Sequence, residues 1–183
     1  MKNTKKLIII TGPSGVGKGT IVKDILKKDK NIWLSISATT RCPREGEEDG
    51  KDYYFFSKKT FQQMIDDEKF LEWAEFAGNF YGTPLDSIKE KIKDGLKVIL
   101  EIEVDGACQV KKRFPNSLSI FLLPPNKKEL ENRIRKRGTD SEESIIKRLE
   151  RANFEMSVSK DFDFVFKNYN VEKTVKEILE IIE

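Results

Sequence analysis

The stretch of residues 7–20 constrains the fold of this chain more than any other. Residues 7–10 form a continuous apolar run that leads directly into a glycine-rich turn ending in Lys18. Such a run predicts a strand that is buried on both faces, as in a parallel sheet. The residues after the turn place apolar side chains on one stripe of an amphipathic helix, at Ile21, Val22, Ile25 and Leu26. The sequence therefore predicts a strand, a turn and a helix in that order.

The glycine-rich turn has the spacing of a phosphate-binding loop. Gly12 and Gly17-Lys18 fit the pattern Gly-x-x-x-x-Gly-Lys. Glycine residues allow successive backbone N–H groups to converge on an anion at a helix N-terminus, and the lysine adds a mobile positive charge. One position departs from the pattern, because Gly19 stands where serine or threonine normally reaches magnesium, and Thr20 follows one place later. Because a strand precedes the turn and a helix follows it, a phosphate cradle is favoured over an ordinary glycine turn.

Composition excludes several classes of function. The 183 residues include 34 Lys and Arg against 31 Asp and Glu, so the net charge of +3 is too small for the basic field of a nucleic-acid binder. The absence of histidine excludes Ser-His triads, histidine-ligated metals and histidine bases. Cys42 and Cys108 lack Cys-x-x-Cys spacing, which predicts reduced thiols. No apolar run is long enough for a signal peptide or a membrane span, so we expect a cytoplasmic protein.

The rest of the chain alternates between strand-like and helix-like segments. We expect further strands at residues 31–37, 98–104, 118–123 and 164–166, and helices near residues 84–94, 106–114 and 171–182. Residues 53–56 and 70–83 are aromatic-rich and β-like, which predicts a small, mostly β insertion over residues 35–83. The basic segment 127–151 predicts two helices, the second starting at Ser141. The expected fold class is α/β, a parallel sheet flanked by helices, with ligands at the carboxyl ends of the strands.

Motifs spread over nearly the whole chain point to one family. They are Ser37-Ala38-Thr39-Thr40-Arg41-Cys42-Pro43-Arg44 with Gly46, Glu47, Gly50 and Tyr53, then Phe70-x-Glu72-Trp73-Ala74, Tyr81-Gly82-Thr83, Glu101-Ile102-Glu103 and Arg133-x-x-x-Arg137-Gly138-Thr139-Asp140-Ser141-Glu142-Glu143. In order and spacing these motifs resemble the guanylate kinases, a family of P-loop nucleoside monophosphate kinases. The resemblance implies a P-loop NTPase fold. It also implies transfer of the γ-phosphoryl group of ATP to GMP, giving ADP and GDP in purine nucleotide metabolism.

The same resemblance implies a division of the chain into three parts. They are a P-loop core of residues 1–34, 84–124 and 157–183, a β-rich GMP-binding insertion of residues 35–83, and a helical lid of residues 125–156. The implied partners are ATP, GMP and dGMP, with no nucleic acid and no membrane. The oligomeric state stays open.

The resemblance also assigns the acceptor site. The residues it implies for GMP are Ser37, Arg41, Arg44, Glu47, Tyr53, Glu72, Tyr81, Thr83 and Glu103. The arginines and tyrosine hydroxyls of this set would hold the phosphate, since guanidinium forks match phosphate geometry and phenols fix its orientation. Glu72, with Ser37 and Thr83, would read the guanine edge. Glu47 would brace the arginine loop.

The donor site follows in the same way. The residues implied for ATP are Gly12, Pro13, Ser14, Gly15, Val16, Gly17, Lys18, Gly19, Thr20 and Asn168. The implied catalytic residues are Lys18, Arg41, Arg133, Arg137 and Arg148, of which the last three would swing onto the ATP phosphates as the lid closes. Mg²⁺ is the expected cofactor, held by ATP phosphates and water, with Thr20 or Glu103 as the nearest protein ligands. Arg135 and Arg151 are expected to be surface or ion-pair residues.

The chain departs from the family pattern at two places. Glu103 stands where the family usually has aspartate, and Asp105 where it has glutamine. The longer Glu103 side chain would shift a contact with GMP or with magnesium-bound water. Tyr169 and Asn170 replace a usual acidic pair beside Asn168, which alters the adenine side of the site.

Three alternative functions share part of these features. An adenylate-kinase-like enzyme would also carry Gly17-Lys18-Gly19-Thr20, but the β-rich insertion with Glu72 favours a guanine acceptor. A regulatory GTPase would need Asn-Lys-x-Asp after a strand, whereas residues 126–129 read Asn-Lys-Lys-Glu after two prolines. A non-catalytic guanylate-kinase-like binding module tends to lack an intact phosphate loop, and Lys18 is present here.

Overall fold

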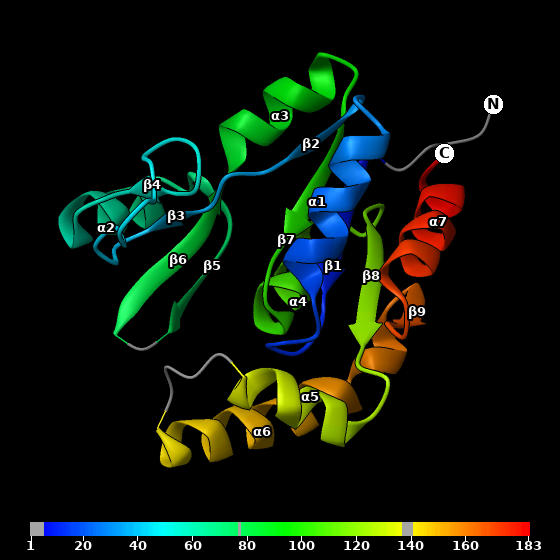
Figure 1. Cartoon of the computed structure of the whole chain (residues 1–183). Coiled ribbons are helices and arrows are strands. Elements are labelled where there is room, and N and C mark those ends of the chain that lie inside the picture. The colour runs from blue at the N-terminus through cyan, green and yellow to red at the C-terminus, as the bar shows by residue number, and fades with distance from the viewer. Residues whose placement is uncertain (1–5, 77, 137–140) are drawn as a thin grey trace.

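The computed structural model describes residues 6–76, 78–136 and 141–183, and its centre is a sheet (Figure 1). In order across this sheet the strands are β2 (Ile32–Leu34), β7 (Lys97–Glu101), β1 (Leu7–Thr11), β8 (Leu118–Leu123) and β9 (Phe164–Lys167). All described neighbours run parallel. The predicted parallel α/β fold is confirmed, and the strand before the glycine-rich turn is its central strand.

Helices cover both faces of the central sheet. On one face they are α1 (Lys18–Lys28) and α7 (Val171–Ile182), and on the other α3 (Leu85–Lys93) and α4 (Val104–Arg113). Side chains of β1 alternate between the two cores, with Ile8 and Ile10 facing the first pair and Leu7 and Ile9 facing the second. The apolar run is continuous because neither face of the strand meets water.

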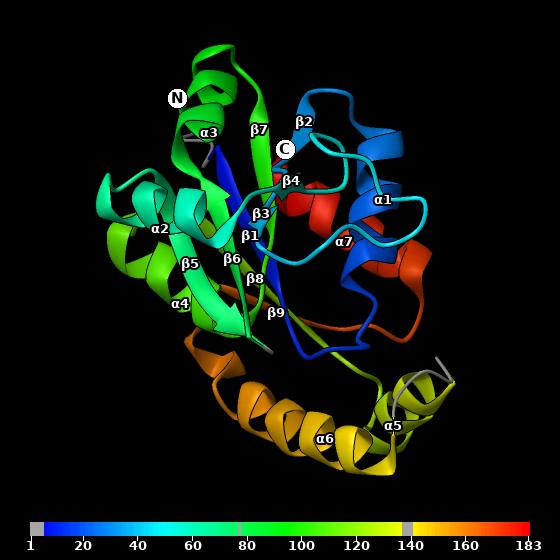
Figure 2. The same cartoon turned by 90° about the vertical axis from the view of Figure 1, so that its left-hand side faces the viewer.

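The segment between β2 and α3 folds into a second sheet, which has the β-rich character that the sequence predicts. In order its strands are β4 (Tyr54–Phe55), β3 (Ala38–Thr39), β6 (Asn79–Pro84) and β5 (Phe70–Phe76). Helix α2 (Lys58–Asp66) packs on it, and the rings of Phe61 and Phe70 stack with centroids 4.3 Å apart. Figures 1 and 2 show this unit beside the central sheet, with α4 running along β5.

Helices α5 (Lys127–Arg135) and α6 (Glu142–Ser157) lie beyond the carboxyl ends of the central strands (Figures 1 and 2). The Asn126 side chain caps α5 by accepting a hydrogen bond from the Glu129 N–H at 2.8 Å. Ser141 caps α6, as predicted. Asn126 therefore serves as a helix cap, which accounts for the asparagine in the near match to a GTPase motif. The two helices share a small core of their own, formed by Leu130, Ile134, Ile145 and Ala152.

Two predicted boundaries are wrong. The sequence predicts a strand over residues 98–104, but β7 ends at Glu101 and α4 begins at Val104. Val104 is apolar because it packs in the core from the helix, and a short apolar run does not distinguish these cases. The strand predicted over residues 31–37 contains only three residues, because the chain then leaves the central sheet for the second one.

The remaining described element is a short 3₁₀ helix, η1 (Ser159–Asp161), between α6 and β9. Among the helices that the structure describes, none has the length and apolar character needed to cross a membrane. Cys42 and Cys108 are free and exposed, as expected for reduced thiols.

Candidate functional site

The glycine-rich loop lies at the carboxyl end of β1. Gly12, Gly15 and Gly17 have φ angles of 144°, 86° and 102°, which L side chains rarely adopt. At Gly12 a side chain would also collide, since a Cβ there would lie 2.3 Å from the Leu122 carbonyl oxygen. Because α1 begins at Lys18, the loop runs into a helix N-terminus, where backbone N–H groups lack helical partners. The backbone therefore has the conformation that an anion cradle requires.

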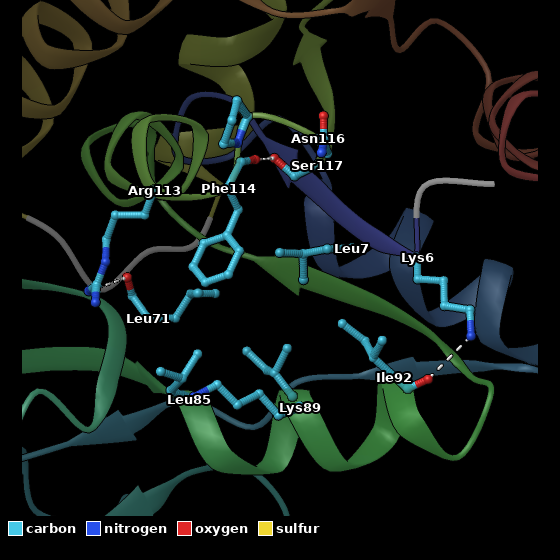
Figure 3. A pocket seen from close by; sticks show the side chains of 12 residues that line it. Lys6, Leu7, Leu71, Leu85, Lys89, Ile92, Arg113, Phe114, Asn116 and Ser117 are labelled. Carbon is cyan, nitrogen blue, oxygen red and sulfur yellow. Dashed lines mark hydrogen bonds between the residues drawn. The ribbon is translucent and has the colours of Figure 1, made fainter. Parts of the chain in front are cut away.

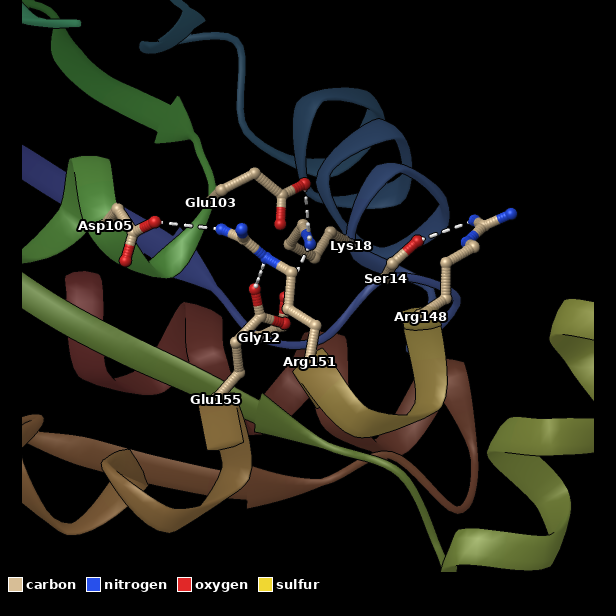
Figure 4. A network of polar contacts seen from close by, with 8 residues as sticks. All are labelled: Gly12, Ser14, Lys18, Glu103, Asp105, Arg148, Arg151 and Glu155. Atoms are coloured by element: carbon tan, nitrogen blue, oxygen red, sulfur yellow. Dashed lines mark hydrogen bonds and ion pairs between the residues drawn. The ribbon is translucent and has the colours of Figure 1, made fainter. Parts of the chain in front are cut away.

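Lys18 lies folded back over this loop (Figure 4). Its Nζ donates to the Gly12 carbonyl oxygen at 2.6 Å and lies 3.5 Å from Glu103 Oε1. The Lys18 side chain is only 10% exposed, whereas Glu103 is exposed at the N-cap of α4. The ammonium group is thus held beside the cradle by a carbonyl group and a carboxylate.

Arginine side chains of α5 and α6 also contact this loop. Arg133 Nη1 donates to the Val16 carbonyl oxygen at 3.2 Å, and Arg148 Nη2 donates to Ser14 Oγ at 2.8 Å. Figure 4 shows Arg148 reaching Ser14. Two of the arginines predicted for the lid therefore meet the cradle, while Arg137 lies outside the described residues.

Asn168 is buried beneath the loop, with 2% of its surface exposed. Its Nδ2 donates to the same Val16 carbonyl oxygen at 3.0 Å. A Cβ on Gly17 would lie 3.0 Å from that Nδ2 atom, so the amide packs tightly against the loop. In this structure Asn168 braces the cradle, and its sequence-based assignment to the adenine stays a prediction.

Glu101 is a further candidate, which the sequence places in a family motif without predicting a role for it in the site. It ends β7, next to β1, and its Oε1 would lie 3.4 Å from a Cβ added to Gly19. Burial raises the pKa of its carboxyl, while Lys18 lowers it and Glu103 raises it further. The signal for Glu101 is its place at the carboxyl end of a strand beside the loop-bearing strand. Thr20, the other predicted magnesium ligand, is exposed at the start of α1.

A cluster around Arg41 lies on the second sheet and the loop after it. Arg41 Nη2 donates to Glu47 Oε1 at 2.9 Å, and its guanidinium lies 5.4 Å from the centroid of the Tyr53 ring. The Glu47 carboxylate, and less strongly Tyr81, raise the pKa of Arg41. Glu47 Oε2 also accepts the backbone N–H of Arg44 at 2.7 Å, so Glu47 braces the arginine loop as predicted, while the Arg44 side chain is exposed.

The ring of Tyr53 contacts both Arg41 and Tyr81. Its ring lies edge-on to Tyr81, with centroids 6.4 Å apart. Burial raises the pKa of the Tyr53 phenol, whereas the Arg41 guanidinium lowers this pKa and the Glu101 carboxylate raises it. Tyr53 therefore belongs to the cluster around Arg41 by its ring contacts with Arg41 and Tyr81.

Glu72 and Thr83 form a buried pair on neighbouring strands. The Thr83 hydroxyl donates to Glu72 Oε1 at 2.6 Å, and the two residues lie opposite each other in the β5–β6 ladder. Glu72 is 6% exposed and Thr83 fully buried, so burial raises the pKa of the Glu72 carboxyl to about 7. Strand alternation places Tyr81 on the same face of β6 as Thr83. Ser37, by contrast, precedes β3, and its carbonyl oxygen accepts from the Tyr54 N–H.

The raised pKa of Glu72 predicts a pH-dependent loss of stability in the protein without ligand. Between pH 4.5 and about 7 the folded state binds more protons than the unfolded state, so stability falls as pH rises through this window. Glu72→Gln removes the buried charge. We expect it to raise the melting temperature at pH 8 and leave it unchanged near pH 4. The corresponding gain in the free energy of unfolding at pH 8 is on the order of 3 kcal/mol at most. Thermal unfolding across this range measures the effect, and parallel pH profiles for the two proteins would contradict it.

Arg151 links α6 to α4 (Figure 4). Its Nη2 donates to Asp105 Oδ2 and its Nε to Glu155 Oε1, each at 2.9 Å. Glu155 is 2% exposed, and burial raises the pKa of its carboxyl although Arg151 lowers it. Arg151 is therefore an ion-pair residue, as predicted, and its partner Asp105 stands where the family usually has glutamine.

A cavity of about 380 Å³ lies between α3 and α4, at the amino ends of the strands (Figure 3). Its lining includes Leu7 at the start of β1 and Ser117 just before β8. The glycine-rich loop follows the opposite end of β1, so this cavity is separate from the loop, its lysine and the arginines.

Comparison with known proteins identifies relatives along the whole chain. The family described as "Guanylate kinase" matches residues 4–183. A guanylate kinase of Prochlorococcus marinus (strain MIT 9312) is 64% identical over 183 residues, which is all of both chains. The crystal structure of guanylate kinase from Anaplasma phagocytophilum is similar with a TM-score of 0.78 and 31% identity, over 100% of this chain and 86% of that one. Shikimate kinase from Bacteroides thetaiotaomicron shares the fold, with a TM-score of 0.53 and 14% identity over 96% of this chain and 97% of that one.

Proposed function

The chain belongs to the guanylate kinase family, and from this premise we propose how its residues transfer the γ-phosphoryl group of ATP to GMP. It is an ATP-dependent nucleoside monophosphate kinase whose products are ADP and GDP. Residues 35–83 form the GMP-binding part of this proposal, residues 125–156 the lid, and the rest of the chain the P-loop core. ATP binds the glycine-rich loop from Gly12 to Thr20.

The buried Glu72–Thr83 pair is the observation that carries the acceptor assignment. Guanine presents N1–H and the N2 amino group side by side, two donors that a single carboxylate accepts. The Thr83 hydroxyl already donates a hydrogen bond to Glu72 Oε1, and this bond orients the carboxylate. GMP therefore binds the ionised form of Glu72, and its two donors compensate the charge that burial otherwise disfavours.

The GMP phosphate is proposed to bind at the Arg41 cluster. Arg41 is aimed by Glu47 and stacked near Tyr53, and Arg44 has an exposed side chain that is free to reach an anion from the same loop. Guanidinium groups bind phosphate oxygens in a bidentate way, and the Tyr81 hydroxyl adds a donor on the same sheet face as Thr83. None of the groups assigned here to the base or the phosphate requires a 2′-hydroxyl, so dGMP is proposed as a second acceptor.

The proposed chemistry needs no protein base. The attacking group is a phosphate oxygen of GMP, which is largely anionic near neutrality because its second pKa is about 6. The protein aligns this oxygen with the γ-phosphorus atom of ATP, and Lys18, Arg133 and Arg148 stabilise charge on the transferred group. The absence of histidine from the chain agrees with this mechanism. Closure of the lid would exclude water, which otherwise competes with GMP as acceptor.

The residues around the loop fit a magnesium ion. Carboxylate oxygens are hard ligands of the kind that Mg²⁺ prefers, and Glu101 and Glu103 both lie beside the cradle. Among the described residues no group of three or more acidic or cysteine side chains could by itself hold a metal. We therefore assign to Glu101, Glu103 and the Thr20 hydroxyl a supporting role toward a Mg²⁺ ion that ATP carries and that neutralises phosphate charge. A cytoplasmic location, in keeping with the free cysteines, completes the proposal.

An acceptor panel tests this function directly. ADP release by the purified protein with ATP and Mg²⁺ is measured with GMP, dGMP, AMP, UMP or no acceptor. We expect rapid release with GMP and dGMP and a rate with AMP lower by about 10⁴, because the guanine site leaves polar groups unpaired against adenine. Equal rates with GMP and without an acceptor, or a preference for AMP, would contradict the proposal.

A further inference from the structure

Helix α4 holds the backbone of β5 on both sides of Glu72. Gln109 exchanges two hydrogen bonds with the backbone of Trp73, accepting from its N–H at 3.4 Å and donating to its carbonyl oxygen at 2.9 Å. Arg113 Nη1 donates to the carbonyl oxygens of Phe70 and Leu71 at 3.0 and 3.1 Å. The strand is therefore fixed immediately before and after Glu72.

Gly106 lies on the same face of α4, one turn before Gln109. A Cβ added to Gly106 would lie 2.5 Å from Glu72 Oε2 and 3.0 Å from Glu72 Cδ, but 3.5 Å from Glu72 Cγ. Gly106 has ordinary helical geometry, so its backbone does not require glycine. The space that its missing side chain leaves is filled by the carboxylate of Glu72.

We propose that Gly106 is the positioning residue that admits the Glu72 carboxylate to its guanine-reading place and thereby sets acceptor selectivity. This inference rests on the proposed function, in which Glu72 reads guanine. A methyl group at position 106 would lie 2.5 Å from Glu72 Oε2, so one of the two groups has to move. The backbone of β5 is held in place by hydrogen bonds from Gln109 and Arg113. The end of the Glu72 side chain, which a single hydrogen bond from Thr83 holds, is the group that moves.

The displacement would break the alignment that two hydrogen bonds to guanine need. Glu72 Oε1 is tied to Thr83 at 2.6 Å, so rotation of the carboxylate away from position 106 also strains that bond. The first turn of α4, where Gly106 lies, is positive through the helix dipole and favours the ionised carboxylate. Moving Glu72 away loses this stabilisation too. ATP is proposed to bind at the glycine-rich loop, whereas the three atoms nearest to a Cβ at position 106 all belong to Glu72.

Gly106→Ala is the test, with steady-state kinetics and calorimetric titration of GMP and ATP as readouts. We expect the KM and Kd for GMP to rise about tenfold or more, since misplacement by about 1 Å has effects of this size or larger. KM for ATP should stay within about twofold of the wild-type value, because the loop is untouched. The higher helix propensity of alanine offsets part of the cost of this crowding, so circular dichroism and a cooperative thermal transition should show that the variant is folded.

Two further variants separate the proposed role from a general effect on α4. Cys108→Ala changes an exposed residue of the same helix and should leave both KM values unchanged. In a Glu72→Ala background there is no carboxylate to displace, so adding Gly106→Ala should not weaken GMP binding further. Equal losses from Gly106→Ala in both backgrounds, or an unchanged KM for GMP in the single variant, would overturn the inference. Failure of the wild-type protein to phosphorylate GMP would instead overturn the proposed function.

Discussion

Lys18→Ala is expected to lower turnover by at least a hundredfold while leaving the fold intact. The Lys18 ammonium lies beside the cradle, 2.6 Å from the Gly12 carbonyl oxygen and 3.5 Å from Glu103 Oε1, and its side chain is almost fully shielded from water. Charge that is pre-positioned in such a site stabilises a transferring phosphoryl group far more than the same charge in water, and removing one donor typically costs 10²–10³ in turnover, or about 3–4 kcal/mol. Turnover at saturating ATP and GMP measures the effect.

Lys23→Ala is the matched control for this prediction, because Lys23 is an exposed lysine of the same helix. It should leave turnover unchanged, and circular dichroism and the melting temperature should show that both variants are folded. If Lys18→Ala kept more than about a tenth of wild-type turnover, a loss below about 1.4 kcal/mol, Lys18 would not act on the transferred group.

The phosphate loop could be predicted from the sequence because its chemistry is local. The backbone conformation of a glycine-rich turn depends mainly on the glycines themselves. Gly12, Gly15 and Gly17, the glycines of the predicted phosphate loop, all have positive φ angles. Ser141 could be predicted as a helix cap for the same reason, since its hydroxyl bonds to a backbone group three residues away. The alternation of strand-like and helix-like segments likewise predicted the parallel central sheet that the structure has.

Other parts of the site depend on contacts between distant segments. Glu101 and Gly19 are far apart in the chain and meet only because β7 and β1 are neighbours in the sheet. Gly106 meets Glu72 only because α4 packs along β5. Asn168 likewise follows Val16 by 152 residues in the sequence, yet its side chain donates to the Val16 carbonyl oxygen. A pattern of residue types does not carry this information, and the wrong end of the strand predicted over residues 98–104 has the same origin.

The family resemblance supplied the assignments that local pattern could not. Glu72 is an example, because nothing in its immediate sequence distinguishes a guanine-reading carboxylate from a surface acid. The structure adds that Glu72 is buried, bonded to Thr83 and has a pKa raised to about 7. Burial of an acid with one neutral hydrogen-bond partner is costly for stability, and this cost is the physical argument for the binding role that we propose for Glu72.

Glu72→Gln is therefore expected to raise KM for GMP about a hundredfold, since a buried hydrogen-bonding group left unpaired costs about 1–3 kcal/mol. The Thr83 hydroxyl would keep donating to the glutamine Oε1, which turns the amide Nε2 toward the guanine N–H groups and sets a donor against donors. KM for ATP should change by no more than about twofold, because the glycine-rich loop is unaffected. Initial rates at varied GMP and ATP measure both constants.

Glu75→Gln is the matched control for the selectivity of Glu72. Glu75 lies on the same strand, and an odd number of residues away, so strand alternation points it to the other face of β5, where it is exposed. It should leave KM for GMP, KM for ATP and the rate with AMP unchanged. Adenine offers an N1 lone pair and a C2–H at the edge where guanine has two donors, so the wild-type carboxylate repels AMP, whereas a glutamine amide can donate to N1. The rate with GMP relative to AMP should accordingly fall in Glu72→Gln alone, and an unchanged ratio together with unchanged GMP affinity would remove Glu72 from the acceptor site.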